Sequence, residues 1–411
     1  MAQAEPLPLS ALLLEEWDAR AIALGGRKFH GRQIFRWIHQ RGIFDPAKMT
    51  DLPGALREKL TEAGLAPPSE ITEMHRSTDD TRKILTRFVD GAVVETVLIP
   101  GVTGPQKFGA SGGRSEPTSF DGLEDADASA SDLEGDDDDD DVPSGPAHGR
   151  SPSKADMRRV TQCISTQVGC AMGCVFCASG VAGLKRHLGA HEIAAQVYAG
   201  RANLDPNERL RNLVYMGMGE PLHNYEATAR SLRLLTSPDG LNLSPRRITV
   251  STSGLVPEIA RLGEEFGGHI GLAISLHAVD DDARTRLMPI NKKYPLKELL
   301  AALAKYPLPK RRRITIEYTL VAGKNDTLEE AAKLASILRN LPVKVNLIPM
   351  NPIEASTLGP PDFARVNAFQ EVVASRGLSV FVRKRRGDDV AAACGQLALA
   401  GAKPKVRVNR S

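Results

Sequence analysis

From about residue 158 onward, short apolar runs alternate with amphipathic stretches, and this alternation restricts the fold more than any other feature of the chain. Helical spacing is clear in Leu296–Leu303 and Leu328–Leu338. The runs around such stretches predict seven strands: Thr161–Ser165, Asn212–Met216, Ile248–Ser251, Gly271–Leu276, Ile314–Leu320, Lys344–Ile348 and Ser379–Arg383. Strands that alternate with helices are joined by right-handed crossovers into a parallel sheet, whose functional groups gather at the carboxyl ends of the strands. We therefore predict an α/β domain over residues 158–397. The number of units suits a partial (β/α)6 barrel better than a flat sheet, although periodicity does not separate the two.

The first hundred residues follow a different pattern. Residues 8–61 show helical spacing, as in Gln33–Ile38, with a break at Asp51–Gly54. Residues 82–99 alternate apolar and polar side chains like paired strands. We therefore predict a small N-terminal helical accessory domain over residues 1–62 and a β extension over residues 63–103 that leads to the barrel.

Residues 104–157 are rich in Gly, Ser, Asp and Pro and nearly free of large apolar residues, so we predict a disordered acidic insert. Within it, residues 121–141 hold twelve acidic side chains and no Lys or Arg. The rest of the chain is therefore more basic than the net charge of +3 suggests, and a basic body attracts polyanions such as nucleic acid. A solvated basic surface without function would carry the same charge. Residues 398–411 form a basic C-terminal tail.

Several classes of protein are disfavoured by composition. No run of 18 or more apolar residues occurs, so we expect no transmembrane helix. Glu5, Glu15 and Glu16 precede the first basic residue, Arg20, which is the opposite polarity to a secretory signal. Five cysteines in 411 residues are too few for a disulfide scaffold. We expect a monomer in the cytoplasm, where thiols stay reduced.

Three of the five cysteines, Cys170, Cys174 and Cys177, lie close together after the first predicted barrel strand. Three thiolates at this spacing can converge on one metal centre, and three incidental buried cysteines are the alternative. A structural zinc site normally has four ligands, and the loop offers no fourth. Iron–sulfur clusters also usually take four cysteines, so a cluster held by three would leave one iron open to a small ligand. An iron–sulfur centre is the interpretation that we favour.

With Phe176 before its last cysteine, this CxxxCxxC loop resembles that of the radical S-adenosylmethionine (SAM) superfamily. The resemblance implies a radical SAM barrel in which the three cysteines hold a [4Fe–4S] cluster and the open iron chelates SAM. A second segment, Met216–Pro221, resembles the Gly-Glu-Pro element of that superfamily, which implies that Gly219 and Glu220 contact SAM. By itself a glycine-rich turn would be weak evidence, since most are simply tight turns.

Further segments narrow the resemblance to the RlmN/Cfr family of RNA adenine methyltransferases. They span nearly the whole chain: Glu95–Pro100, Cys163–Cys170, Ser251–Gly254, Ser275–His277, Asn346–Pro352 and Gly387–Leu397. The resemblance implies that the N-terminal helical domain is an accessory domain for RNA binding. It also implies further SAM contacts from Ser251, Ser275, Leu276, His277 and Asn351. The acidic insert is the one large departure from the family pattern.

Carbon 2 of adenine is electron-poor and carries no acidic proton, so an ordinary methyl transfer from SAM has no nucleophile there. The family's chemistry implies two SAM molecules per turnover. One methylates Cys394, and the other is cleaved at the cluster to a 5′-deoxyadenosyl radical that takes hydrogen from this methyl group. The methylene radical adds to the base, Glu95 removes the ring proton, and Cys163 then attacks the Cys394 sulfur. The resulting transient disulfide must be reduced before the next turnover.

Without the resemblance, each of these residues has a simpler interpretation. Cys163 and Cys394 would be small buried hydrophobes, and Glu95 would be an exposed residue on an alternating strand. His277 would be a histidine packed under a loop at a strand end. The functional interpretation of all four therefore depends on the family.

The resemblance implies that the substrates are 23S rRNA and some tRNAs, methylated at carbon 2, and that a reductant such as flavodoxin with its reductase supplies electrons. The basic runs Lys310–Arg313 and Arg383–Arg386 are candidates for contacts with RNA phosphates. Two other functions remain open. One is Cfr-type methylation of carbon 8 of the same adenine in 23S rRNA, which confers antibiotic resistance. The other is a non-catalytic iron–sulfur RNA-binding protein in which Cys394 is only structural.

Overall fold

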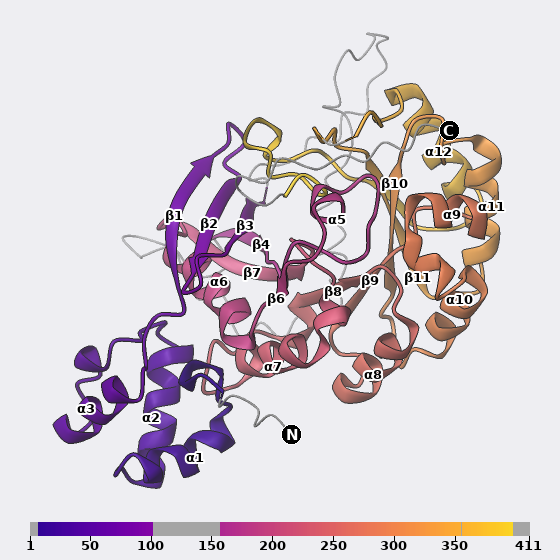
Figure 1. Ribbon diagram of the computed structural model, residues 1–411. Coiled ribbons are helices and arrows are strands. Elements are labelled where there is room, and N and C mark those ends of the chain that lie inside the picture. Colours follow the sequence, from indigo (N-terminus) through magenta and orange to yellow (C-terminus); the bar gives the residue numbers. More distant parts are fainter. Residues whose placement is uncertain (1–6, 102–156, 355, 398–411) are drawn as a thin grey trace, which may run out of the picture.

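The structure is a computed structural model that describes residues 7–101, 157–354 and 356–397 (Figure 1). The predicted acidic insert, apart from residue 157, and the predicted basic tail lie outside these ranges. Within them, the chain forms a helical N-terminal region followed by a large α/β unit that is built on one ten-stranded sheet.

The N-terminal region has three helices and two short 3₁₀ turns: α1 (Leu14–Ala23), α2 (Lys28–His39), α3 (Gly54–Glu62), Leu9–Ala11 and Pro46–Lys48. The helical spacing predicted here is confirmed. It turns Ile34 and Ile38 of α2 into the core, where Trp17 of α1 is also fully buried. This region packs on the barrel through a buried contact of 2.6 Å between His39 Nδ1 of α2 and Tyr198 Oη of the helix α6 (Ala190–Ala202).

The sheet combines an antiparallel extension with a parallel section. Its ten strands, in spatial order, are β1 (Ser69–Arg76), β2 (Arg82–Phe88), β3 (Val93–Pro100), β4 (Arg158–Cys163), β7 (Glu208–Tyr215), β8 (Ile248–Thr252), β9 (Gly271–Ser275), β10 (Ile314–Leu320), β11 (Val343–Pro349) and β12 (Val380–Val382). The pairs from β1 to β4 are antiparallel, and all pairs from β4 to β12 are parallel. The sheet does not close, because β1 and β12 are its two ends among the described strands.

Six crossover helices connect the seven parallel strands, which gives the predicted partial (β/α)6 barrel. They follow the outer side of the curved sheet in Figure 1: α6 (Ala190–Ala202), α7 (Tyr225–Thr236), α8 (Val256–Phe266), α10 (Leu296–Lys305), α11 (Leu328–Leu338) and α12 (Phe363–Ala374). Shorter elements follow the carboxyl ends of strands: β5 (Gln167–Val168), β6 (Arg186–His187), α5 (Ala178–Ala182), α9 (Asp281–Leu287) and the 3₁₀ turns Pro221–Asn224, Pro289–Lys292 and Asp388–Val390. A further 3₁₀ turn, Pro245–Arg247, precedes β8.

Each of the seven predicted parallel strands is present, but β7 begins earlier than its apolar run. The structure starts this strand at Glu208, whereas the sequence predicts Asn212. The reason is a buried ion pair: Glu208 receives a hydrogen bond from Arg82 of β2, and both side chains are buried. Two polar side chains that are paired with each other can be buried in a sheet. Such a pair extends a strand although no apolar residue in the sequence marks the start of that strand.

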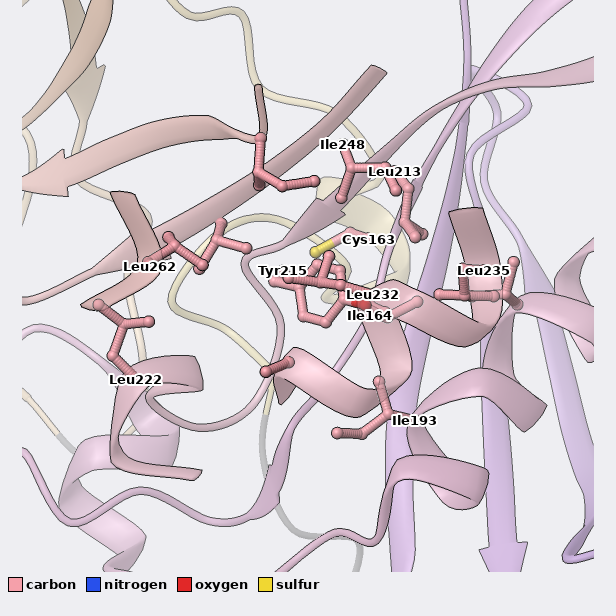
Figure 2. Close-up of a cluster of buried hydrophobic side chains, with 14 of the residues drawn as sticks. Cys163, Ile164, Ile193, Leu213, Tyr215, Leu222, Leu232, Leu235, Ile248 and Leu262 are labelled. Carbon is pink, nitrogen blue, oxygen red and sulfur yellow. The ribbon is translucent and has the colours of Figure 1, made fainter. Parts of the chain in front are cut away.

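The core of the barrel lies between the sheet and its crossover helices. Figure 2 shows Cys163, the last residue of β4, within a cluster of buried side chains that includes Ile164, Ile193, Leu213, Tyr215, Leu232, Leu235 and Ile248. Parallel strands typically carry buried side chains on both faces of their sheet. In the ranges that the structure describes, no helix combines the length and the apolar character needed to cross a membrane.

Candidate active site

The three cysteines of the CxxxCxxC loop line one pocket at the carboxyl ends of the parallel strands. We call this space the cluster pocket. The loop between β5 and α5 is tightly folded and requires glycine at position 169. Gly169 has φ +78°, and a Cβ on it would lie only 1.9 Å from the Gly183 carbonyl oxygen. The empty space of the pocket, including the part that is open to solvent, is about 910 Å³.

Burial raises the pKa of all three thiols, that of Cys170 to about 12, and the neighbouring cysteines add to the rise for Cys174 and Cys177. A set of thiolates is therefore unfavourable here without a cation, because metal binding is what deprotonates buried cysteine ligands. Within residues 7–101, 157–354 and 356–397, no three His, Cys, Asp or Glu side chains are arranged to hold a single metal ion. Three thiols that line one pocket have the chemistry to hold an iron–sulfur cluster when one is bound.

The turn after β7 forms a second wall of the cluster pocket. Glu220 is buried, and its carboxylate accepts hydrogen bonds from the backbone N–H groups of Ser253 at 2.7 Å and Leu222 at 3.1 Å. Burial raises the pKa of Glu220, while these hydrogen bonds oppose the rise. Gly219 has φ +105°, and a Cβ there would lie 2.6 Å from the Cβ of Gln167, so this turn requires glycine.

Four of the five other predicted SAM contacts also line the cluster pocket: Ser251, Ser275, His277 and Asn351. Leu276 is not among the lining residues, and its side chain is fully buried. The Nδ1 atom of His277 accepts a hydrogen bond of 2.9 Å from the Thr319 N–H, and burial lowers the pKa of this imidazole to about 3. The ring is therefore neutral at pH 7 and carries its hydrogen on Nε2.

Arg284 of α9 connects the strand-end segments that form the walls of the cluster pocket. Its fully buried guanidinium donates to the carbonyl oxygens of Ser253 (2.6 Å), Ser275 (3.2 Å) and Leu276 (3.1 Å) and to Oδ1 of Asn291 (3.0 Å). Burial lowers the pKa of Arg284 to about 10, which leaves it charged at pH 7. The positions of two pocket walls therefore depend on one buried cation.

Two buried polar atoms in the wall of the cluster pocket have no hydrogen-bond partner among the described residues: Ser253 Oγ and Asn351 Oδ1. Ser253 and Asn351 are 5% and 6% exposed, so bulk water does not satisfy these atoms. Buried polar groups are nearly always hydrogen-bonded in native proteins. A polar small molecule such as SAM fits this pocket, because it would supply the missing partners.

The segment that carries Cys394 packs directly on the cysteine loop. The Asn351 amide donates to the Cys394 carbonyl oxygen at 2.9 Å, and the Ala178 N–H donates to the Gly395 carbonyl oxygen at 2.8 Å. A Cβ on Gly395, which has φ +83°, would lie 3.2 Å from the Phe176 carbonyl oxygen. These contacts place Cys394 in the wall of the cluster pocket, although it is distant from the cysteine loop in the sequence.

Cys394 also lines a second, adjoining pocket together with Cys163, which we call the cysteine pocket. All five cysteines of the chain are free thiols in this structure. Burial raises the pKa of Cys163 to about 12, Cys394 adds to the rise, and Arg383 opposes it. The basic run Arg383–Arg386 lines the cysteine pocket as well, so this predicted RNA-contacting run meets the two cysteines.

Glu95 lines neither pocket. It lies on β3, two residues before Val97, which is paired with Cys163 of β4. The Glu95 side chain is buried and forms an ion pair of 3.3 Å with Lys83 Nζ of β2. Its backbone carbonyl accepts a hydrogen bond from Ser165 Oγ at 2.7 Å. The predicted proton acceptor is therefore on a strand next to Cys163, in a paired and buried state.

The sequence did not single out Arg284, Ser253 or Lys83, and it assigned Arg383 to an RNA-contacting run without placing it in the wall of both pockets. A signal for Ser253 existed, because it lies within a segment already matched to the family. An arginine in an ordinary amphipathic helix such as α9 offers no comparable signal. The other predicted RNA-contacting run, Lys310–Arg313, precedes β10 and lies at the opposite end of the barrel.

Comparison with known proteins identifies the family. Residues 9–64 match the ribosomal RNA large subunit methyltransferase N-terminal domain, and residues 164–335 match the radical SAM superfamily. The dual-specificity RNA methyltransferase RlmN of Sorangium cellulosum (strain So ce56) is 64% identical over 402 residues, which cover 98% of each chain. The chain belongs to the RlmN family of radical SAM RNA methyltransferases.

Other relatives of the RlmN family agree. The protein of the same name from Anaeromyxobacter sp. (strain Fw109-5) is 42% identical over 404 residues, covering 97% of this chain and 92% of that one. The crystal structure of a radical SAM methyltransferase from Sphaerobacter thermophilus is 39% identical, with a TM-score of 0.78, and covers 95% of this chain and 99% of that chain. The family, fold class and enzyme class predicted from the sequence are confirmed.

Proposed function

We propose that this chain methylates carbon 2 of a specific adenosine in 23S rRNA, at the peptidyl transferase centre, and of the adenosine next to the anticodon in some tRNAs. The relatives named dual-specificity RNA methyltransferases support this assignment. The single observation that carries the chemistry is the position of Cys394, which lines both the cluster pocket and the cysteine pocket. One thiol can therefore face a methyl donor on one side and a resolving thiol and an RNA base on the other.

In this proposal the cysteine loop holds a [4Fe–4S] cluster, and the other walls of the cluster pocket bind SAM, of which two molecules are used per turnover. When bound, these groups supply a methyl group to the Cys394 sulfur and a 5′-deoxyadenosyl radical. This radical takes a hydrogen atom from that methyl group. The chain contributes unsatisfied polar atoms, Ser253 Oγ and Asn351 Oδ1, that orient SAM. The proposed SAM contacts are Gly219, Glu220, Ser251, Ser275, Leu276, His277 and Asn351.

The remaining steps belong to residues of the chain. Asn351 holds the Cys394 backbone, so that the methylated sulfur keeps one orientation while its methylene carbon bonds to adenine. The adduct gives up one electron, for which the bound cluster would be the acceptor, and Glu95, held 3.3 Å from Lys83, accepts the ring proton. The Cys163 thiolate then attacks the Cys394 sulfur and forms a disulfide. The bond between this sulfur and the methylene carbon breaks, and that carbon takes up a proton to become the methyl group of the released RNA.

An external reductant is needed to reopen this disulfide and to supply electrons to the cluster. We propose a donor such as flavodoxin with its reductase, and a monomeric enzyme in the cytoplasm. The run Arg383–Arg386 in the wall of the cysteine pocket supports an approach of RNA phosphates to the two cysteines. The target adenine must leave its stack to reach them, as is usual for enzymes that modify bases.

The experiment is an anaerobic reaction of purified, cluster-loaded protein with SAM, reductant and RNA from a strain that lacks the modification. We expect 2-methyladenosine in 23S rRNA and in tRNA by mass spectrometry of the nucleosides. A carbon-8 product would assign the Cfr-type alternative instead, and RNA binding without any product would support the non-catalytic alternative.

Two cysteine variants separate the roles of the pockets. Cys394→Ala is expected to keep the cluster absorbance and the RNA affinity but to form no product, because it removes only the proposed methyl carrier. Cys170→Ala is the matched control, which loses the cluster absorbance as well as the product. Methylation by Cys394→Ala at the wild-type rate would disprove the mechanism.

A further inference from the structure

A third polar pocket lies at the opposite end of the barrel from the cysteines. Arg246 and Arg247 immediately precede β8, Arg312 and Arg313 immediately precede β10, and Lys344 is the second residue of β11. These five cationic side chains line one pocket, which we call the basal pocket, and no Asp or Glu is among its lining residues.

The strand register places the basal pocket at the amino ends of the parallel strands. Thr249 of β8 pairs with Gly271, the first residue of β9, and Thr315 of β10 pairs with Lys344 of β11. Cys163, by contrast, is the last residue of β4. Because all these strands are parallel, the basal pocket lies toward the end of the barrel opposite to the cysteines. None of its lining residues lines the cluster pocket or the cysteine pocket.

Arg312 of the basal pocket is not fully satisfied within the described chain. Nη1 of Arg312 is buried without a hydrogen-bond partner among the described residues. Burial lowers the pKa of Arg312, and the like charge of Arg246 lowers it further. Arg313 donates to a neutral group, Ser379 Oγ, at 2.7 Å. Lys344 is 9% exposed, and its electrostatic partner is Glu317 of β10, which lies nearer to the carboxyl ends of the strands.

We propose that the basal pocket binds a phosphate group. Paired guanidinium groups present forks of N–H donors that match phosphate oxygens, and a dianion would offset the repulsion between Arg246 and Arg312. The side chains of Thr249 and Thr315 also line the pocket and bring hydroxyl groups to it. The phosphate comes either from the backbone of a bound RNA or from a free phosphate compound.

The test titrates pyrophosphate into the full-length protein by calorimetry, at constant ionic strength set with chloride. In the double variant Arg246→Gln, Arg312→Gln we expect at least a tenfold loss of affinity. The matched control is Arg339→Gln, Arg376→Gln, which removes two exposed charges next to α11 and α12, outside the lining of the pocket. This control should bind pyrophosphate within twofold of the wild type.

Two further measurements exclude misfolding as the cause. The thermal midpoint of the unliganded double variant should equal or exceed that of the wild type, because like-charge repulsion has been removed. The conservative variant Arg246→Lys, Arg312→Lys keeps both charges but loses the paired N–H donors of the guanidinium groups, so it should bind pyrophosphate with intermediate affinity. Equal affinity of the glutamine variant and its control for pyrophosphate would overturn the proposal.

A second arm distinguishes the two sources of phosphate. If the RNA backbone occupies the pocket, the glutamine variant binds protein-free tRNA more weakly than its control and with a shallower salt dependence. If a free phosphate compound occupies it, tRNA affinity matches the control although pyrophosphate binding is lost. Both results support a phosphate site, and neither requires methylation, so the test is independent of the proposed function.

Discussion

Replacement of Arg284 by methionine should strongly destabilise the barrel, because this buried guanidinium is the shared donor of two pocket walls. It donates to three backbone carbonyl oxygens and to Asn291 Oδ1 over distances of 2.6–3.2 Å. Methionine has a similar length but donates nothing. The four acceptors would remain buried without this donor, and buried acceptors without partners are unfavourable.

The magnitude follows from two opposing effects. A hydrogen bond to a charged group contributes about 1.5–3 kcal/mol, so four such bonds would sum to about 6–12 kcal/mol. The burial of Arg284 is itself unfavourable, as the lowering of its pKa to about 10 shows, and its removal returns part of that free energy. Each neutral acceptor that is left buried without a partner costs about 1–3 kcal/mol, so after this offset we expect a net loss of about 3–5 kcal/mol.

Urea unfolding followed by far-ultraviolet circular dichroism measures this loss. Tryptophan fluorescence would not report on the barrel, because Trp17 and Trp37 both lie in the N-terminal helical region. The control is Arg286→Met on the same helix, since Arg286 is exposed and should change the free energy of unfolding by less than about 0.5 kcal/mol. A difference below 1 kcal/mol between the two variants would refute the reasoning.

Three further outcomes are expected. Cys163→Ala should trap RNA covalently bound to the protein, seen as a nuclease-sensitive gel shift, and normal turnover would contradict the resolving role. Gly219→Ala should weaken SAM binding at least tenfold in equilibrium dialysis, since φ +105° and the contact with Gln167 exclude a Cβ; wild-type affinity would argue against this tight turn. Burial lowers the pKa values of His39 and His277 to about 3 from 6.5, so the unfolded chain binds more protons between these pH values and stability falls below pH 6.5. At pH 5 each histidine should remove about 2 kcal/mol, and urea unfolding of His39→Gln should show a smaller pH dependence than the wild type.

Much of the fold could be predicted because its signals are local. The alternation of buried runs and amphipathic stretches marked all seven parallel strands, and α11 and β10 have the predicted bounds. The early start of β7 could not be predicted, because Glu208 is stabilised by Arg82 on a strand that is distant in the sequence. An ion pair of this kind leaves no periodic pattern.

The candidate site also combines features that the sequence predicted with features that it could not predict. The spacing of the cysteine loop was sufficient to propose a metal centre, and short segments were sufficient to recognise the family. The sequence could not show that Leu276 is absent from the lining of the cluster pocket, that Glu95 is paired with Lys83, or that Arg383 lies in the walls of two pockets.

The amino-acid order alone therefore determined the parallel α/β architecture, the thiol spacing and the family, since each depends on residues that are neighbours along the chain. Only the tertiary structure decided that Cys394 joins the cysteine loop to Cys163, and that five cations gather beneath the barrel. The physical reason is that such contacts follow from strand order and register. Strand order and register are set only when the whole sheet buries both of its faces, and the local propensities of single residues do not encode them.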